Sequence, residues 1–161
     1  MSDISDFEVI SEHECRQLLA QQCIGRVAFM GAVGYPVVLP VNYFIDGDVI
    51  AFRTADGEKF ESIPMQRVAF QVDGFDKESR TGWSVLAQGL GQDITEAAGV
   101  RYERLRRRAF STWAPGEKSL WLAVDVRQVS GRRVFSIEDP TRSWFEAYDW
   151  QTYDGTSLLP S

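Results

Sequence analysis

The stretch YPVVLPVNYFIDGDVIAFRT, residues 35–54, predicts the central feature of the fold. Its two apolar runs, YFID and VIAF, meet at Asp46-Gly47, and an Asp-Gly pair between two apolar segments is a strong signal of a tight β-hairpin. Proline cannot donate a hydrogen bond to a neighbouring strand. Pro36 and Pro40 therefore predict that the first strand of this hairpin has an exposed edge, or a bulge near Pro40.

Other segments rich in Val, Ile, Phe and Trp, bounded by Gly, Pro and Asp, predict further strands. They are residues 25–31, 67–74, 82–94 and 119–135. Ser11 followed by Glu14 has the spacing of a capping box and predicts a helix over 12–21; shorter helical segments are expected near 58–64 and 95–110. Six antiparallel strands with two or three inserted helices favour a small closed barrel, because closure removes exposed sheet edges.

Length and composition indicate one ordinary globular domain. The chain has 161 residues, of which 44% are hydrophobic and 25% charged, enough to bury a core without disulfides. No apolar run approaches the roughly 18 residues of a membrane span, and the acidic start MSDISDFEVISEHE is unlike a secretory or transit sequence. We therefore expect a cytoplasmic protein that does not bind membranes. The net charge of −6 also disfavours binding to nucleic acid.

Few residues are available for metal or triad chemistry. Cys15 and Cys23 are the only cysteines and His13 is the only histidine, and they lack the paired spacing of zinc ligands. A single histidine leaves little room for a Ser-His-Asp or Cys-His hydrolase. We expect no metal site, and we expect His13 to be a solvated helix residue.

The segment FRTADGEKF (52–60) places two cations and a hydroxyl at a predicted strand-to-helix corner. Arg53 can bind two phosphate oxygens with its planar guanidinium, Thr54 can donate one hydrogen bond, and Lys59 adds a mobile positive charge. Gly57 would allow the backbone to approach closely, and the start of the following helix would favour an anion. These features predict a phosphate site; the alternative is a polar turn that happens to carry two cations.

Two further segments are unusual in composition. Residues 136–161 are acidic but rich in aromatics, unlike most disordered tails. These aromatic residues are Trp144, Phe145, Tyr148, Trp150 and Tyr153. We expect this extension to pack on the chain's own barrel, on a partner subunit or at the rim of a ligand pocket.

The run RYERLRRR (101–108) is expected to be a solvated helix face; the alternative is that it binds an acidic cofactor tail or an acidic substrate.

Several segments in a fixed order resemble a known family. They are CRQLLAQQCIGRVAF (15–29), YPVVLPVNYFIDGDVIAFRTADGEKF (35–60), VAFQVDGFD (68–76), RTGWSVLAQGLGQDI (80–94) and VSGRRV (129–134). Together they are similar to the pyridoxamine 5′-phosphate oxidase-like family, in particular to its actinobacterial flavin or deazaflavin oxidoreductases. The resemblance implies a six-stranded antiparallel split β-barrel over residues 1–135 that binds FMN. It also implies a homodimer with two cofactor sites at the subunit interface.

The resemblance further implies which residues bind the cofactor. The third strand and the helix after it would hold the phosphate, backbone groups of the preceding strand would line the isoalloxazine, and the GWSV strand would approach the ring from the other subunit. The residues implied for the phosphate are Arg53, Thr54 and Lys59. Those implied for the isoalloxazine are Pro40, Val41 and Asn42, and those of the GWSV strand are Trp83 and Ser84. No catalytic residue is assigned.

The sequence departs from the family pattern in two respects. It lacks the paired Arg and His that hold the substrate of true pyridoxamine phosphate oxidases, and Gln88 stands where the family usually has a basic residue. We therefore expect a flavin-dependent oxidoreductase that transfers hydride from FMN to another small molecule. The alternatives are a reductase that uses the deazaflavin coenzyme F420, and a non-catalytic flavin- or haem-binding protein.

Overall fold

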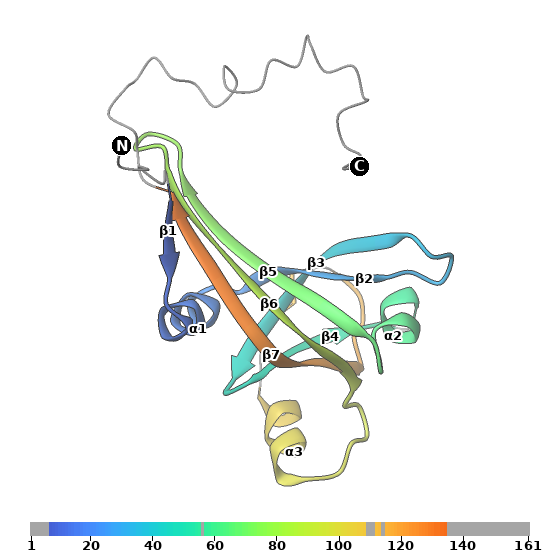
Figure 1. Cartoon of the computed structure of the whole chain (residues 1–161). Coiled ribbons are helices and arrows are strands. Elements are labelled where there is room, and N and C mark those ends of the chain that lie inside the picture. Colours follow the sequence, from blue (N-terminus) through green and yellow to red (C-terminus); the bar gives the residue numbers. More distant parts are fainter. Residues whose placement is uncertain (1–6, 56, 109–111, 114, 135–161) are drawn as a thin grey trace.

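The computed structural model describes residues 7–55, 57–108, 112–113 and 115–134 as a β-rich unit with three short helices (Figure 1). The strands are β1 Phe7–Ile10, β2 Ile24–Met30, β3 Pro36–Asp46, β4 Val49–Thr54, β5 Arg67–Asp76, β6 Thr81–Asp93 and β7 Leu120–Val134; the helices are α1 Glu12–Gln21, α2 Glu58–Ser62 and α3 Val100–Arg107. Every pairing between these strands is antiparallel. The predicted class, mainly β with inserted helices, is confirmed.

Six of these strands close into a ring. The sheet order is β1-β7-β4-β3-β2-β5-β6. A further pairing of β6 with β7 closes the strands from β7 to β6 into a ring. Along its other edge, β7 pairs first with β4, through residues 120–125, and then with β1, through residues 131–134. The predicted six-stranded antiparallel barrel is therefore confirmed. The seventh strand, β1, was not predicted, because the four residues FEVI are too short to show a period of their own.

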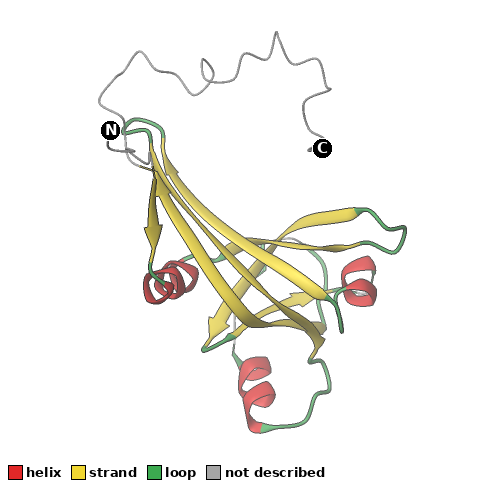
Figure 2. Ribbon diagram, viewed as in Figure 1, coloured by secondary structure: helices red, strands yellow, loops and turns green. Residues whose placement is uncertain are grey.

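The two prolines of β3 lie where its edge is exposed. β3 pairs with β2 without interruption from Pro36 to Asn42, but it pairs with β4 only from Tyr43 to Asp46. The first seven residues of β3 thus have no strand partner on the β4 side within the described residues, and the β2–β3 hairpin projects from the barrel (Figure 2). The exposed edge predicted from Pro36 and Pro40 is confirmed, and the β2–β3 register contains no bulge near Pro40.

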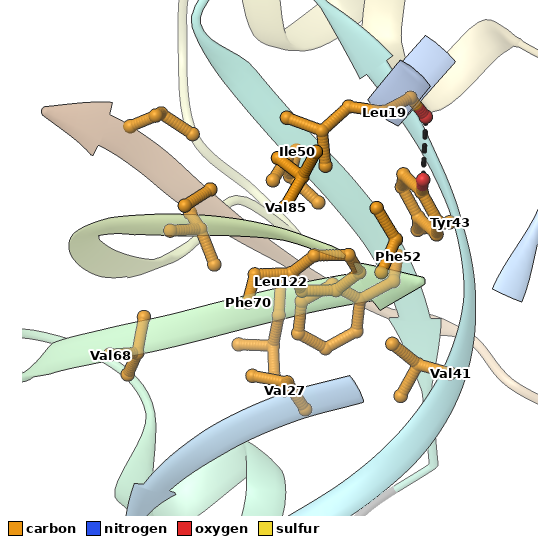
Figure 3. Packing of buried hydrophobic residues seen from close by; sticks show 14 of the residues in the cluster. Leu19, Val27, Val41, Tyr43, Ile50, Phe52, Val68, Phe70, Val85 and Leu122 are labelled. Carbon is orange, nitrogen blue, oxygen red and sulfur yellow. Dashed lines mark hydrogen bonds between the residues drawn. The ribbon is translucent and has the colours of Figure 1, made fainter. Parts of the chain in front are cut away.

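The barrel interior is filled by side chains that alternate along the strands. Ile50 and Phe52 of β4 point inward and pack with Val27, Phe70 and Leu122, all of which are fully buried (Figure 3). The opposite face of β3, β4 and β7 carries a smaller cluster beneath α3. Its buried members are Phe44, Val49, Ala51, Ile94, Leu105, Trp121 and Ala123. Because β4 is covered on both faces, its sequence is a continuous apolar run rather than an alternating one.

Helix α1 has the predicted boundaries and packs on β7, β3 and β6. The Ser11 hydroxyl accepts a hydrogen bond from the Glu14 backbone N–H at 3.2 Å, as the capping-box spacing predicted. Gly131 of β7 makes the close packing possible, because a Cβ at that position would lie 2.6 Å from Cys15 Sγ. Tyr43 of β3 donates its hydroxyl hydrogen to the Leu19 carbonyl at 2.5 Å (Figure 3).

Helices α2 and α3 are shorter than the segments predicted for them, 58–64 and 95–110. The segment before α3 is bound to β7 instead of being helical, since the Ile94 N–H donates to the Trp121 carbonyl at 3.0 Å and the Trp121 N–H donates to the Thr95 hydroxyl at 2.9 Å. The helix begins only after Gly99, whose φ of +118° suits glycine. At its other end Arg108 is already extended.

No helix in the described part of the chain is long and apolar enough to cross a membrane. The same residues contain no group of three or more His, Cys, Asp or Glu side chains placed to bind a metal ion. The aromatic extension predicted over 136–161 lies outside the described residues.

Replacing Tyr43 with Phe should lower the free energy of unfolding by about 1–2 kcal/mol, because the buried Leu19 carbonyl loses its donor. Burial raises the pKa of Tyr43 above its ordinary value. Its contribution to stability is therefore complete below about pH 10, the pKa of tyrosine in an unfolded chain, and is lost as the pH rises above that value. Urea denaturation at pH 7 and above pH 10 should show the gap between wild type and Tyr43→Phe shrinking at the higher pH.

The exposed Tyr35 provides a matched control, because its side chain is 75% accessible. Tyr35→Phe should leave the stability unchanged at both pH values. Equal losses in the two variants at pH 7 would contradict the role assigned to the Tyr43 hydrogen bond.

Candidate functional site

Arg53 occupies the end of β4 with part of its guanidinium unsatisfied. It lies across from Trp121 of β7 in the register, and its Cζ atom is 5.6 Å from the centroid of the Trp121 ring, a cation–π distance. Its Nε atom is buried and has no hydrogen-bond partner among the described residues. No carboxylate of those residues forms an ion pair with it. An unpaired buried donor is costly, so Arg53 is well suited to bind an anion.

Thr54 points to the other face of β4. Its side chain is only 2% exposed, and its hydroxyl donates to the Ala55 carbonyl at 3.0 Å. Consecutive strand residues face opposite sides of the sheet, so Arg53 and Thr54 do not share one face. One phosphate can contact both Arg53 and Thr54 only if it lies beyond the end of β4, where the chain turns toward α2.

Lys59 lies in the first turn of α2 and is partly buried. Burial, and secondarily the positive charge of Lys118, lowers the pKa of Lys59 below its ordinary value. Within the described residues Lys59 takes part in no ion pair. Helix α2 has only five residues, too few for the helix-start argument made from the sequence. Positive potential at this corner therefore comes from side chains.

Residues Pro40 to Asn42 border the same corner. Because Tyr43 pairs with Phe52, Asn42 is the first residue of β3 beyond its pairing with β4, next to Arg53. The Asn42 side chain accepts a hydrogen bond from the Trp113 backbone N–H at 2.7 Å and donates to the Cys23 carbonyl at 3.4 Å. Pro40 is exposed, and Val41 is buried in the barrel. The structure thus gathers Asn42, Arg53, Thr54 and Lys59 around one end of β4.

Trp83 and Ser84 are distant from that corner in the same chain. Along β7, Trp83 is paired with Arg133 and Arg53 with Trp121. The twelve residue-to-residue steps from 121 to 133 span roughly 40 Å along extended strand. Trp83 covers Gly74 of β5, where a Cβ would lie 2.7 Å from the indole nitrogen. The predicted site residues therefore form two separate groups within one chain.

A cavity borders each of these groups. The one beside Trp83 has a volume of about 380 Å³ and is also lined by Gly74 and Arg133. The one beside Asn42 has a volume of about 420 Å³ and is also lined by Cys23, Arg108 and Trp113. Neither Arg108 nor Trp113 was predicted as a site residue, because a long loop brings them to β3 and no local motif marks them. A third cavity, of about 770 Å³, is lined by residues of β2, β5, β6 and β7 and borders neither group. Its polar lining includes Gln88, the residue at the position that is usually basic in the family.

Three of the five arginines in the run 101–108 also contact other parts of the chain. Arg104 forms an ion pair with Asp46 at 2.7 Å, and Arg106 donates to the Ile94 and Ala97 carbonyls at 2.6 and 2.9 Å. The guanidinium of Arg108 lies 4.6 Å from the centroid of the Phe44 ring. The expected solvated face is nevertheless present: the arginines at 101, 104, 107 and 108 are all exposed, and only Arg106 is partly buried.

The architecture defined by this ring of strands is a split β-barrel with cationic side chains at the end of β4. The family model of pyridoxamine 5′-phosphate oxidase matches residues 11–133, which is nearly the whole described unit. The chain therefore belongs to this family, and the resemblance inferred from the sequence motifs is confirmed.

Individual relatives agree with this assignment. The uncharacterized protein Rv0080 of Mycobacterium tuberculosis is 30% identical over 132 residues, covering 78% of this chain and 84% of that protein. A solved structure described as the FAD binding protein from Mycobacterium smegmatis is similar with a TM-score of 0.64 and 25% identity, covering 79% of this chain and 97% of that one. A FAD-binding protein from Mesorhizobium loti has the same TM-score and identity, with 80% and 98% covered. The family to which the chain belongs thus includes flavin-binding proteins.

Replacing Arg106 with Ala should lower the free energy of unfolding by about 1–3 kcal/mol, because two part-buried carbonyls lose a charged donor. Thermal or urea denaturation would measure the change. Arg107→Ala is the matched control, since Arg107 is the exposed neighbour on the same helix, and it should change stability by no more than about 0.5 kcal/mol. A loss in the control as large as in Arg106→Ala would contradict the anchoring role.

Proposed function

We propose that this protein binds the flavin nucleotide FMN through Arg53, Thr54 and Lys59 and uses it to transfer hydride to a small-molecule acceptor. The observation that carries the proposal is the buried Nε of Arg53, unpaired among the described residues at a corner that also holds Lys59. A phosphate would supply both the missing acceptor and the counter-charge. Because two structural relatives are described as FAD-binding, FAD is the nearest alternative, followed by the deazaflavin coenzyme F420 and haem.

The chain's own residues would bind, orient and shield the cofactor, which supplies the redox chemistry when it is bound. The backbone of residues 40–42 would border the ring system next to the phosphate corner. This arrangement requires no catalytic histidine, and the single histidine, His13, is exposed on α1. An acceptor without a phosphate group is favoured, because the chain lacks the Arg and His pair that would hold a phosphorylated pyridoxal.

We further propose a homodimer in which each cofactor site takes residues from both chains. Within one chain Trp83 and Arg53 are separated by about twelve residues of β7, so a second chain is needed to bring Trp83 to the same flavin. The projecting β2–β3 hairpin also exposes apolar side chains that a partner would cover. They are Met30, Val33 and Val38.

Subunit mixing tests the shared site. Light scattering should give a dimer at micromolar concentration, and both Arg53→Ala and Trp83→Ala homodimers should bind FMN weakly. A mixed dimer of the two variants should regain one full-affinity site, because one of its two sites then contains both native residues. A monomer, or a mixed dimer without a full-affinity site, would contradict the shared-site arrangement.

The phosphate contacts are tested by flavin affinity. Arg53→Ala should weaken FMN binding by roughly 10- to 150-fold, the equivalent of one hydrogen bond to a charged group. Lys59→Ala should weaken it less, because a lysine makes a single, mobile contact. Fluorescence titration would measure both, with riboflavin as the control ligand because it has the ring but no phosphate. Unchanged FMN affinity in two folded variants would exclude this assignment.

Turnover separates an oxidoreductase from a flavin carrier. The apo-protein is titrated with FMN, FAD, coenzyme F420 and haem, and the loaded protein is then reduced anaerobically and mixed with quinone and nitro acceptors. Reoxidation of the protein-bound flavin in step with acceptor reduction supports the proposed activity. Failure of both FMN and FAD to bind below about 100 μM, roughly 5.5 kcal/mol of affinity, would reject the flavin proposal.

A further inference from the structure

Two of the chain's three lysines lie near the end of β4. The lysines are Lys59, Lys77 and Lys118. Thr54, the last residue of β4, pairs with Leu120, the first residue of β7. The antiparallel register therefore places the segment that leads from β4 to α2 beside the segment that leads into β7. Lys59 lies in the first turn of α2, directly after the first segment, and Lys118 lies on the second segment.

The side chain of Lys118 is partly buried and is directed along its own loop. Its Nζ donates to the Pro115 carbonyl at 3.1 Å. Its positive charge is close enough to Lys59 to add to the lowering of the Lys59 pKa, after the larger effect of burial. Two ammonium groups near each other repel, and they do so more strongly where burial weakens the screening by water.

Such an arrangement is unexpected in a protein of net charge −6, in which acidic residues outnumber lysines and arginines by 23 to 17. No described carboxylate forms an ion pair with Lys59 or with Arg53. An anion held between two ammonium groups removes their repulsion and gains a charge-assisted hydrogen bond from each.

We propose that Lys118 is a further phosphate-binding residue, which with Lys59 holds the terminal phosphate group of the bound flavin nucleotide. This inference rests on the proposed function for the identity of the ligand. It adds to the site a residue from the loop that leads into β7, so that the chain on each side of the β4–β7 pairing contributes a lysine.

The test compares Lys118→Gln with Lys77→Gln in the full-length protein. Lys77 is the matched control, because it is exposed on the turn between β5 and β6 and carries the same charge. Lys118→Gln should weaken FMN binding by about 5- to 30-fold, toward the lower range for a hydrogen bond to a charged group, and should leave riboflavin binding unchanged. Lys77→Gln should change neither. Unchanged FMN affinity in Lys118→Gln, or an equal loss for FMN and riboflavin, would overturn the proposal.

A second measurement does not depend on flavin. With only three lysines, the side-chain Nζ signals can be followed individually by NMR in the flavin-free protein. Lys118→Gln should raise the pKa of Lys59, and inorganic phosphate should shift the Lys59 and Lys118 signals but not that of Lys77. An unchanged Lys59 pKa, or phosphate shifts no larger than those of Lys77, would overturn the role of Lys118. Phosphate binding at this pair without any flavin binding would instead reject the proposed function and retain the anion site.

Discussion

The pairing of β7 along both of its edges is the constraint on which the rest of the molecule depends. One edge pairs with β6 from Leu122 to Val134, and the other is divided between β4 and β1. A bulge in β7, opposite Gln88–Gly89 of β6, interrupts this long pairing, and Gly89 is needed there because a Cβ would lie 2.1 Å from the Asp125 carbonyl oxygen. The division of the second edge is what splits the barrel. It also sets the two groups of candidate site residues at opposite ends of β7.

The same pairing decides which side chains meet. It puts Arg53 against the Trp121 ring and turns Thr54 into the barrel, although the two are neighbours in sequence. It also brings the segment before β7 next to the segment after β4, so that cations from two distant parts of the chain share one corner. The register thus concentrates positive charge locally in an acidic protein.

For anion binding, the placement of the charged side chains matters more than the net charge of the protein. Most of the ion pairs in the described residues are exposed and contribute little to stability individually. The arginines in these pairs are Arg16, Arg26, Arg104, Arg127 and Arg133. Arg53 and Lys59 differ from them because burial reduces their contact with water and no described carboxylate offsets the charge. In RYERLRRR, the richest cationic run in the sequence, three of the five arginines by contrast contact carbonyls, an aspartate and an aromatic ring.

The sequence by itself determined the features that depend on near neighbours: the Asp46-Gly47 hairpin, the capped helix α1, the exposed proline edge of β3 and the motif order that indicates the family. Turn, cap and edge signals are local, because each is set by the φ angles and hydrogen bonds of a few consecutive residues. The tertiary structure alone decided the short β1 strand, the late start of α3, the separate faces of Arg53 and Thr54, and the placement of Lys118 near Lys59. These features depend on the register of β7 with strands far away in the chain, and no local sequence pattern indicates that register.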